Sequence, residues 1–173
     1  MTRILCTVYK VAAAMFIGLL GIGFSSTASA DCWFKAGQQH NIDPLLLYSI
    51  AKVESSLNPN AFNRNRNGTY DVGLMQINSS HLPWLSKVGI TRESLVTDSC
   101  TSVMVGAQIL SGFIAQYGYT WEAVGAYNAG GRADRREHRQ RYATKVWRHY
   151  VALQQAEKSR HPGQKLAVRN RGS

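Results

Sequence analysis

The sequence predicts a single α-rich domain, all-α in class, between about Asp31 and Gln155. Its length of 173 residues is typical of one domain with a short extension. Apolar residues make up 45% of the chain, which is enough for a core and excludes a mostly disordered protein. Helix-capping residues precede most of the apolar runs, and no internal repeat stands out. We therefore expect one compact domain built mainly from helices.

Residues 1–30 have the three-part organisation of a secretory signal peptide. Arg3 and Lys10 give a basic start, the uncharged run Val11–Phe24 follows, and Ala28–Ala30 (ASA) fits a cleavage site. A transmembrane helix is the alternative, but this run has 14 residues, whereas a membrane span needs about 20. The mature chain is expected to begin at Asp31, without a lipid anchor because no cysteine lies at the cleavage point.

Caps and apolar spacing predict the first elements of the mature chain. Asp43 and Pro44 provide an N-cap and a first helical residue for the apolar run Leu45–Val53, and Asn58-Pro59 ends this helix. The Asn- and Gly-rich segment 60–70 is predicted to be a loop. The short apolar run 72–77 fits either a helix or a strand.

The second half of the domain is predicted to be helical. Thr91 caps a short helix over 92–95, Thr101 caps a longer one that ends at Gly118, and Thr120 caps a helix over 121–129. The last helix is predicted over residues 139–155, where four side chains share one face: Tyr142, Val146, Tyr150 and Leu153.

The net charge of +10 is unevenly distributed. Residues 31–131 carry six Lys and Arg against seven Asp and Glu, a net of −1, whereas residues 132–173 carry twelve against three, a net of +9. Apolar residues nearly vanish toward the C-terminus, so residues 156–173 are predicted to form a basic disordered tail. Nucleic acid binding is not expected of an exported domain whose basic tail lacks aromatic residues.

Cysteine usage agrees with export. Cys6 leaves with the predicted signal peptide, and the mature chain keeps Cys32 and Cys100. An even pair in an exported protein predicts one disulfide, and two free buried thiols are the alternative. No Cys and His spacing of a metal site is present, so we expect neither a metal nor another cofactor.

Glu54 is the strongest candidate for a catalytic residue. On a helix that starts at Pro44, it lies at the edge of an apolar stripe formed by Leu47, Ile50 and Ala51. Desolvation there, together with the negative end of the helix dipole, should raise the pKa of its carboxyl group. A Glu that stays protonated near neutral pH can act as the general acid in glycosidic cleavage. The alternative is a surface Glu paired with Lys52 or Arg64.

Two further segments place amides and a phenol in apolar surroundings. They are Gly73–Asn78 (GLMQIN) and Ala126–Gly130 (AYNAG). Gln and Asn side chains both donate and accept hydrogen bonds, which suits the N-acetyl and hydroxyl groups of amino sugars. The phenol of Tyr127 could orient a nearby carboxylate by a hydrogen bond. The alternative is that Gly73 and Gly130 only punctuate helices and that the polar residues are caps.

Taken together, these motifs resemble a known family. Glu54-Ser55, Asn58-Pro59 with Ala61, GLMQIN and AYNAG occur in the order found in the lytic transglycosylase (SLT) domain, which has a goose-lysozyme-like fold. The resemblance covers about residues 32–150, including the paired cysteines and Tyr117–Gly130. It is strongest to the small soluble group associated with conjugation, pilus assembly and type III or type IV secretion.

The resemblance implies a role for each matching residue. Glu54 matches the single catalytic acid/base, and Ser55 matches the neighbour that helps to hold the site. Met75 and Gln76 match the glycan-contacting segment, while Tyr127 and Asn128 match contacts that position the carboxylate and the sugar. One carboxylate suffices if the substrate's own C6 hydroxyl or N-acetyl oxygen attacks the anomeric carbon. Asp71 is the nearest second carboxylate, and we interpret it as a cap at the end of the polar loop.

The resemblance also implies a substrate and a location. The family cleaves the β-1,4 bond between N-acetylmuramic acid and N-acetylglucosamine and forms a 1,6-anhydro product, which would open the wall locally for an envelope-spanning apparatus. We therefore expect a periplasmic protein whose partners are peptidoglycan strands and components of such an apparatus. The alternatives are a non-catalytic wall-binding or scaffold protein and a true muramidase. The basic tail would be a solvated extension, attract the anionic wall or dock on the apparatus.

Overall fold

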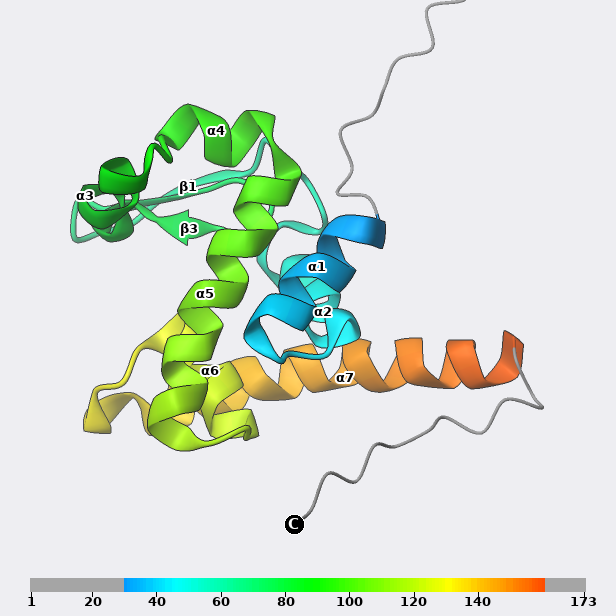
Figure 1. Ribbon diagram of the computed structural model, residues 1–173. Helices are drawn as coiled ribbons and strands as arrows, with labels where there is room; N and C mark the ends of the chain where they lie inside the picture. The colour runs from blue at the N-terminus through cyan, green and yellow to red at the C-terminus, as the bar shows by residue number, and fades with distance from the viewer. Residues whose placement is uncertain (1–29, 161–173) are drawn as a thin grey trace, which may run out of the picture.

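The computed structural model describes residues 30–160. The predicted signal peptide, apart from Ala30, and the last part of the predicted tail lie outside the described residues. The described chain folds into helices and one small antiparallel sheet of strand order β1-β2-β3 (Figure 1). The helices are α1 (Ala30–His40), α2 (Pro44–Ser55), α3 (Leu82–Leu85), α4 (Arg92–Thr97), α5 (Ser99–Tyr117), α6 (Trp121–Ala129) and α7 (Arg136–Arg160), and the strands are β1 (Phe62–Arg64), β2 (Tyr70–Val72) and β3 (Ile77–Asn78). Three 3-10 turns complete the described part: η1 (Ser79–His81), η2 (Ser86–Val88) and η3 (Ala133–Arg135).

Helix α5 is the central element of the domain (Figure 1). The sheet, α3 and α4 lie toward one of its ends, whereas α6 and α7 lie toward the other, and α1 and α2 lie beside it. Side chains from every one of these groups meet in one core, which includes Leu47, Ile77, Val103, Leu110 and Val146, all essentially without exposure. The prediction of one α-rich domain is confirmed. Within the described residues no helix is both long and apolar enough for a membrane span.

The structure confirms five of the predicted caps: Asp43, Thr91 and Thr120 begin helices, and Gly118 and Gly130 end them. The Asp43 side chain accepts a hydrogen bond from the Leu45 N–H at 2.8 Å and begins α2, as predicted. The helix ends with Ser56 in the left-handed region, at φ 55°. The prediction that Thr101 caps α5 is wrong. Asp98 is the cap, because its carboxylate accepts from the Cys100 N–H at 2.9 Å and the helix begins at Ser99.

Segment 60–70 is not entirely a loop, and the ambiguous run 72–77 contains strand rather than helix. Strands β1 and β2 form a hairpin in which Asn63 faces Asp71, and β3 adds to β2 with Asn78 opposite Asp71. The hairpin turns through Asn67-Gly68, where Gly68 has φ 84°. An Asn-Gly pair between residues that alternate in polarity is a hairpin signal, but the high Asn content of the segment obscures it.

Helix α7 is longer than predicted. It begins at Arg136 and ends at Arg160, so the prediction of a disordered tail from residue 156 is wrong for residues 156–160. These residues are exposed, but Ala, Glu, Lys and Arg are good helix formers, and they can extend a helix that tertiary contacts have already formed. The predicted disulfide is confirmed, since Cys32 in α1 bonds to Cys100 in α5 with their Cα atoms 5.3 Å apart.

Candidate active site

Glu54 lies in the last turn of α2, at the edge of the predicted apolar stripe. Leu47, Ile50 and Ala51 on the preceding turns have no exposure, so the carboxyl group lies against the core and faces a cavity. Burial raises the pKa of Glu54 from 4.5 to about 7. The group is therefore protonated over the mildly acidic range, as a general acid must be.

Two side chains from distant elements hold this carboxyl group. The Tyr142 hydroxyl of α7 donates a hydrogen bond to Glu54 Oε1 at 2.6 Å, and the Asn128 amide at the end of α6 also hydrogen-bonds it. Both contacts, together with the charge of Lys145, lower the Glu54 pKa, and the charge of Asp71 raises it, but desolvation is the largest cause. The sequence places Tyr142 only on an apolar helix face and does not indicate its role.

Tyr127 has a different partner from the one expected. Its hydroxyl donates to the Met75 backbone carbonyl at 2.9 Å rather than to the Glu54 carboxyl group. Burial raises the pKa of Tyr127 well above 10, so the phenol remains a donor. The interaction that the sequence suggests for Tyr127 is made by Tyr142, while Tyr127 links α6 to the turn that precedes β3.

The turn over residues 73–76 places the GLMQIN segment beside Glu54. Ser55 Oγ donates to the Leu74 carbonyl at 2.7 Å, so the residue next to the acid holds the turn. Gly73 is required there because it has φ 76° and because a Cβ would collide with the Leu95 carbonyl oxygen. Met75 is fully buried, so its side chain supports the turn from the core and does not line the cavity.

Gln76 completes this turn in the left-handed region, at φ 48°. Its Nε2 donates to the Ala61 carbonyl at 3.1 Å and to the Gly73 carbonyl at 3.0 Å. These bonds commit the amide nitrogen to the backbone and fix the side chain, which lines the cavity. The amide oxygen then remains as a fixed acceptor for a ligand hydroxyl or N–H group.

Asp71 occupies the centre of the sheet rather than a loop end, so its interpretation as a cap is wrong. The register places the side chains of Asn63 and Asn78 on the same face as Asp71. Asn78 Nδ2 donates to Asp71 Oδ1 at 2.7 Å, and Asn65 Nδ2 donates to Oδ2 at 2.9 Å. Asn63 Nδ2 adds a longer bond to Oδ2 at 3.4 Å. The result is a second carboxylate held rigidly in the same cavity as Glu54.

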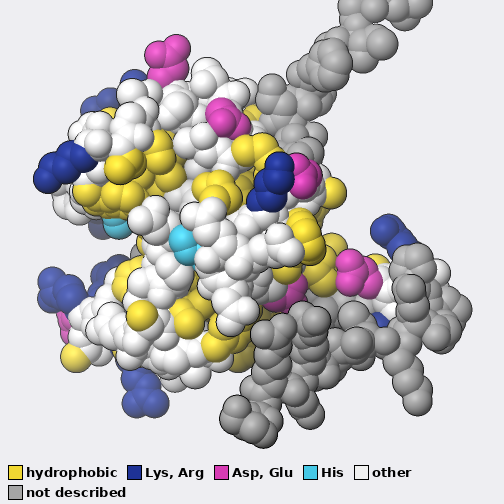
Figure 2. Space-filling model, in the orientation of Figure 1, with side chains coloured by type: hydrophobic (Ala, Val, Ile, Leu, Met, Phe, Trp, Pro, Cys, Tyr) yellow, Lys and Arg dark blue, Asp and Glu magenta, His cyan; other side chains and the backbone are white. Residues whose placement is uncertain are grey.

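The cavity is a groove of about 980 Å³ between the sheet and the α5–α6 side of the domain. Figure 2 shows the surface hollowed between these two parts of the molecule, with Lys and Arg side chains on both. Arg66 lines the groove from the hairpin turn, and Arg135 lines it from η3. Its remaining walls combine amides with apolar side chains, among them Asn67, Asn78, Ile109 and Phe113.

A buried arginine fixes the segment between α6 and α7, which forms one wall of the groove. Arg139 is 5% exposed, and its Nε lies 2.5 Å from Glu122 Oε1. Its Nη1 donates to the carbonyls of Gly130 at 3.1 Å and Arg132 at 2.6 Å. The guanidinium group therefore donates hydrogen bonds to the backbone carbonyls of the segment that follows Asn128. Nothing in the sequence pattern marks this arginine among its many basic neighbours.

A buried carboxyl group whose pKa is raised to about 7, in an amide-lined groove, is the arrangement expected of an enzyme that uses a general acid on a carbohydrate. Within residues 30–160 no group of three or more His, Cys, Asp or Glu could hold a metal ion. Residues 31–150 match the family model of the transglycosylase SLT domain. The chain belongs to this family and is a lytic transglycosylase.

Curated relatives are similar to this chain over most of its length. Invasion protein IagB of Salmonella typhimurium is 50% identical over 138 residues, which span 80% of this chain and 86% of IagB. Protein IpgF of Shigella flexneri is 44% identical over 124 residues, or 72% of this chain and 82% of IpgF. The X polypeptide of Escherichia coli is 40% identical over 142 residues, or 81% of this chain and 84% of that protein.

The fold is similar to that of lytic transglycosylase Slt from Pseudomonas aeruginosa, solved by X-ray crystallography as an inactive mutant. The TM-score is 0.59 with 22% sequence identity. The match covers 77% of this chain but only 25% of Slt, so this chain corresponds to about a quarter of that larger protein.

Proposed function

We propose that this enzyme cleaves the β-1,4 bond between N-acetylmuramic acid and N-acetylglucosamine in peptidoglycan and forms a 1,6-anhydro end on the muramic acid. The observation that carries the proposal is the environment of Glu54. Its pKa of about 7 lets one group release a proton early in the reaction and accept one later, near neutral pH.

The reaction needs one carboxyl group if the substrate supplies the nucleophile. Glu54 donates its proton to the leaving O4 as the bond from C1 to O4 breaks. The C6 hydroxyl oxygen of the muramic acid then bonds to C1, and its proton passes to the Glu54 carboxylate. No water is consumed, and Glu54 ends protonated as it began. Tyr142 and Asn128 stabilise the carboxylate between these two transfers, because both hydrogen-bond it.

The groove also suits an anionic polymer. Peptidoglycan carries carboxylates on its stem peptides, and the guanidinium groups of Arg66 and Arg135 line the groove from opposite walls. In the described part of the chain neither arginine forms an ion pair within 4 Å, so both are available to a ligand. We assign the sugar contacts to Gln76 and Asn128, with Ser55, Met75 and Tyr127 supporting them from behind.

A true muramidase is the second candidate, and Asp71 is the observation that favours it. A hydrolase needs a second carboxylate that assists water or stabilises the positive charge at C1. Asp71 lies in the same groove, with its oxygens held by amides. The two mechanisms share Glu54 and differ in the attacking group, so their products distinguish them.

The decisive experiment is mass spectrometry of digested, purified sacculi. We expect 1,6-anhydromuramic ends from the wild-type protein and none from Glu54→Gln. Reducing ends that incorporate ¹⁸O from labelled water would establish the muramidase instead. If the wild-type protein binds sacculi but produces no new glycan ends, the result would support a non-catalytic scaffold protein instead. A parallel digest with Asp71→Asn tests whether Asp71 is needed for whichever product forms.

We further propose that the protein is exported to the periplasm and opens the wall locally for an envelope-spanning apparatus. The support is the signal-peptide pattern of residues 1–30 and the similarity to a protein named for invasion. N-terminal sequencing of the periplasmic fraction should find Asp31 as the first residue. Full-length protein retained in the cytoplasm would contradict the export proposal. Crosslinking in cells that assemble such an apparatus would identify the partner.

A further inference from the structure

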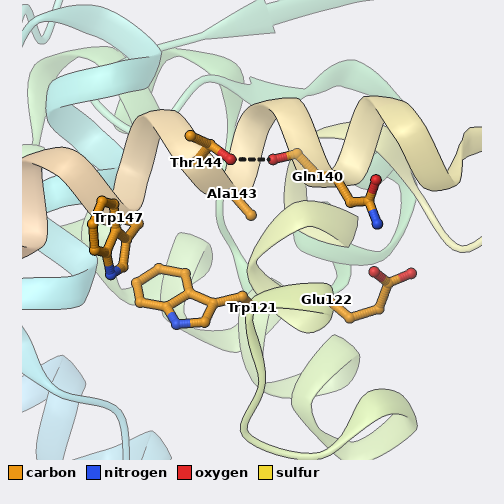
Figure 3. Close-up of a pocket in the computed structure, with 6 residues that line it drawn as sticks. All are labelled: Trp121, Glu122, Gln140, Ala143, Thr144 and Trp147. Atoms are coloured by element: carbon orange, nitrogen blue, oxygen red, sulfur yellow. Dashed lines mark hydrogen bonds between the residues drawn. The ribbon is translucent and has the colours of Figure 1, made fainter.

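A second cavity, of about 400 Å³, lies between α6 and α7 (Figure 3). It is lined by two tryptophans, one alanine and three polar side chains: Trp121, Trp147, Ala143, Glu122, Gln140 and Thr144. None of these residues lines the catalytic groove. We call this cavity the tryptophan pocket.

The two indoles form one end of the tryptophan pocket, and Glu122 and Gln140 form the other (Figure 3). Trp121 is 39% exposed and Trp147 is 47% exposed, although large aromatic side chains are usually buried. Trp121 is held in place by an edge contact with Tyr150, with ring centroids 5.9 Å apart. The pocket therefore presents aromatic surface to solvent, and the Trp121 ring in it is held in place.

The polar end is neutral and suited to hydrogen bonding. The Glu122 carboxylate is paired with the buried guanidinium of Arg139 at 2.5 Å, so it adds no free negative charge. Thr144 Oγ1 donates to the Gln140 backbone carbonyl at 2.9 Å and keeps its lone pairs as acceptors. In the described part of the chain the exposed Gln140 amide has no intramolecular partner, so its donors and its oxygen can serve a ligand.

The surroundings of the tryptophan pocket are positively charged. Arg136 lies one helical turn before Gln140 on α7, and Arg148 lies one turn after Thr144. Both are exposed, and neither has an ion pair among the described residues. An anionic polymer that reached the pocket would therefore meet two guanidinium groups beside it.

We propose that the tryptophan pocket binds an amino sugar of a second peptidoglycan segment and so holds the enzyme on its substrate. The apolar faces of the sugar ring would lie against the indoles. Its N-acetyl and hydroxyl groups would bond Gln140 and Thr144, and the stem-peptide carboxylates would meet Arg136 and Arg148. The volume falls within the range of roughly 300–1,000 Å³ typical of small-ligand sites. This inference rests on the proposed function, because it takes the same polymer as ligand.

The two sites face different sides of α7. Tyr142, which contacts Glu54, and Trp147 are five residues apart on this helix, a rotation of about 140° at 3.6 residues per turn. Because the two sites lie on different sides of this helix, we do not expect one short glycan to fill both the groove and the tryptophan pocket. The pocket should therefore strengthen attachment to the multistranded wall without changing cleavage of short fragments.

The first test measures binding without cleavage, in Glu54→Gln protein. The probe is a soluble tetrasaccharide of alternating N-acetylglucosamine and N-acetylmuramic acid that carries its stem peptides. The chain has four tryptophans, so each indole N–H signal in an NMR spectrum can be assigned from single Trp→Phe variants. We expect saturable shifts for Trp121 and Trp147 and none for the buried Trp33. Unchanged Trp121 and Trp147 signals, while the Gln76 amide reports a filled groove, would overturn the proposal.

The second test compares Trp147→Ala with Phe34→Ala in otherwise wild-type protein. Phe34 is a matched control because it is an aromatic residue of α1 that is 54% exposed and lines neither cavity. We expect Trp147→Ala to weaken binding to sacculi about fivefold, the loss of roughly 1 kcal/mol, with unchanged turnover of the tetrasaccharide and an unchanged melting temperature. Equal binding by the two variants would overturn the proposal.

The outcomes also separate this inference from the proposed function. Wild-type protein that cleaves nothing, but whose Trp121 and Trp147 signals respond to the tetrasaccharide, would refute the activity and keep the site. Cleavage by the wild-type protein, without any change in the Trp121 and Trp147 signals, would confirm the activity and refute the site. If Trp147→Ala lowers the melting temperature, Gln140→Ala, which removes only an exposed amide, provides the same comparison.

Discussion

Replacement of Glu54 by Gln tests the buried protonated carboxyl group through stability as well as activity. Burial raises the Glu54 pKa from 4.5 to about 7. Between these pH values the folded protein keeps a proton that the unfolded chain has released. The free energy of unfolding therefore falls as pH rises through this window, by about 1.4 kcal/mol per pH unit for one such group. Over the difference between the two pKa values this amounts to about 3 kcal/mol.

The Gln variant should lose this pH dependence and keep the packing. Its amide oxygen can still accept the hydrogen bond from Tyr142, and its volume is nearly that of Glu, but it does not ionise. The difference in unfolding free energy, variant minus wild type, should rise from pH about 4.5 to about 7 and stay constant above it. Urea unfolding across this range measures it, and all other titrating groups cancel in the difference.

Glu157→Gln is the matched control, because Glu157 is exposed in the last turns of α7. It makes the same Glu-to-Gln change at an exposed side chain, so its difference curve supplies the baseline. A Glu54→Gln curve that coincides with this baseline would refute the reasoning, since burial would then have no effect on the Glu54 pKa. In the same preparations, wild-type turnover should fall as pH rises through about 7, and Glu54→Gln should lose about 10²–10⁴-fold in rate.

Three further substitutions test the contacts around this site. Tyr142→Phe removes a hydrogen bond that lowers the Glu54 pKa, so the alkaline limb of the pH–rate profile should move up by about one unit, and an unmoved limb would contradict the assigned contact. Gly125→Ala would place a Cβ 2.5 Å from the Arg139 carbonyl oxygen, and urea unfolding should show a loss of about 1–3 kcal/mol or more. Cys100→Ser opens the cross-link to Cys32 and should cost about 4 kcal/mol on the chain-entropy model; an unchanged melting temperature would show that the cross-link contributes little.

The sequence predicted what local rules determine. Asp43 and Pro44 define the start of α2, and the position of Glu54 on its apolar edge follows from helical periodicity alone. Both features depend on residues within two or three turns of one another, which is the range over which spacing carries information. The direction of the Glu54 pKa shift could be predicted from that position, although the burial that causes the shift depends on the assembled domain.

The residues that the sequence did not indicate act through long-range contacts. Tyr142 reaches Glu54 from 88 positions further along the chain, and its spacing on α7 shows only that it faces the core. Tyr127 and Tyr142 both lie on helices that pack near the acid, so residue type could not decide which hydroxyl bonds the carboxyl group. The sheet was missed for a different reason, because strands of two or three residues are too short to show an alternation of apolar and polar side chains.

The Glu54 pKa is a property of the assembled domain rather than of the motif that contains it. Desolvation depends on α2 packing into the core, the opposing hydrogen bonds come from Asn128 in α6 and Tyr142 in α7, and Asp71 contributes its charge from the sheet. Buried Arg139 holds α6, α7 and the intervening segment together through Glu122 and two backbone carbonyls. A change that loosens this helix pair would therefore admit water to the carboxyl group and remove both of its donors. Because these effects shift the pKa in opposite directions, the acid could keep a similar pKa and still lose the fixed orientation that proton transfer requires.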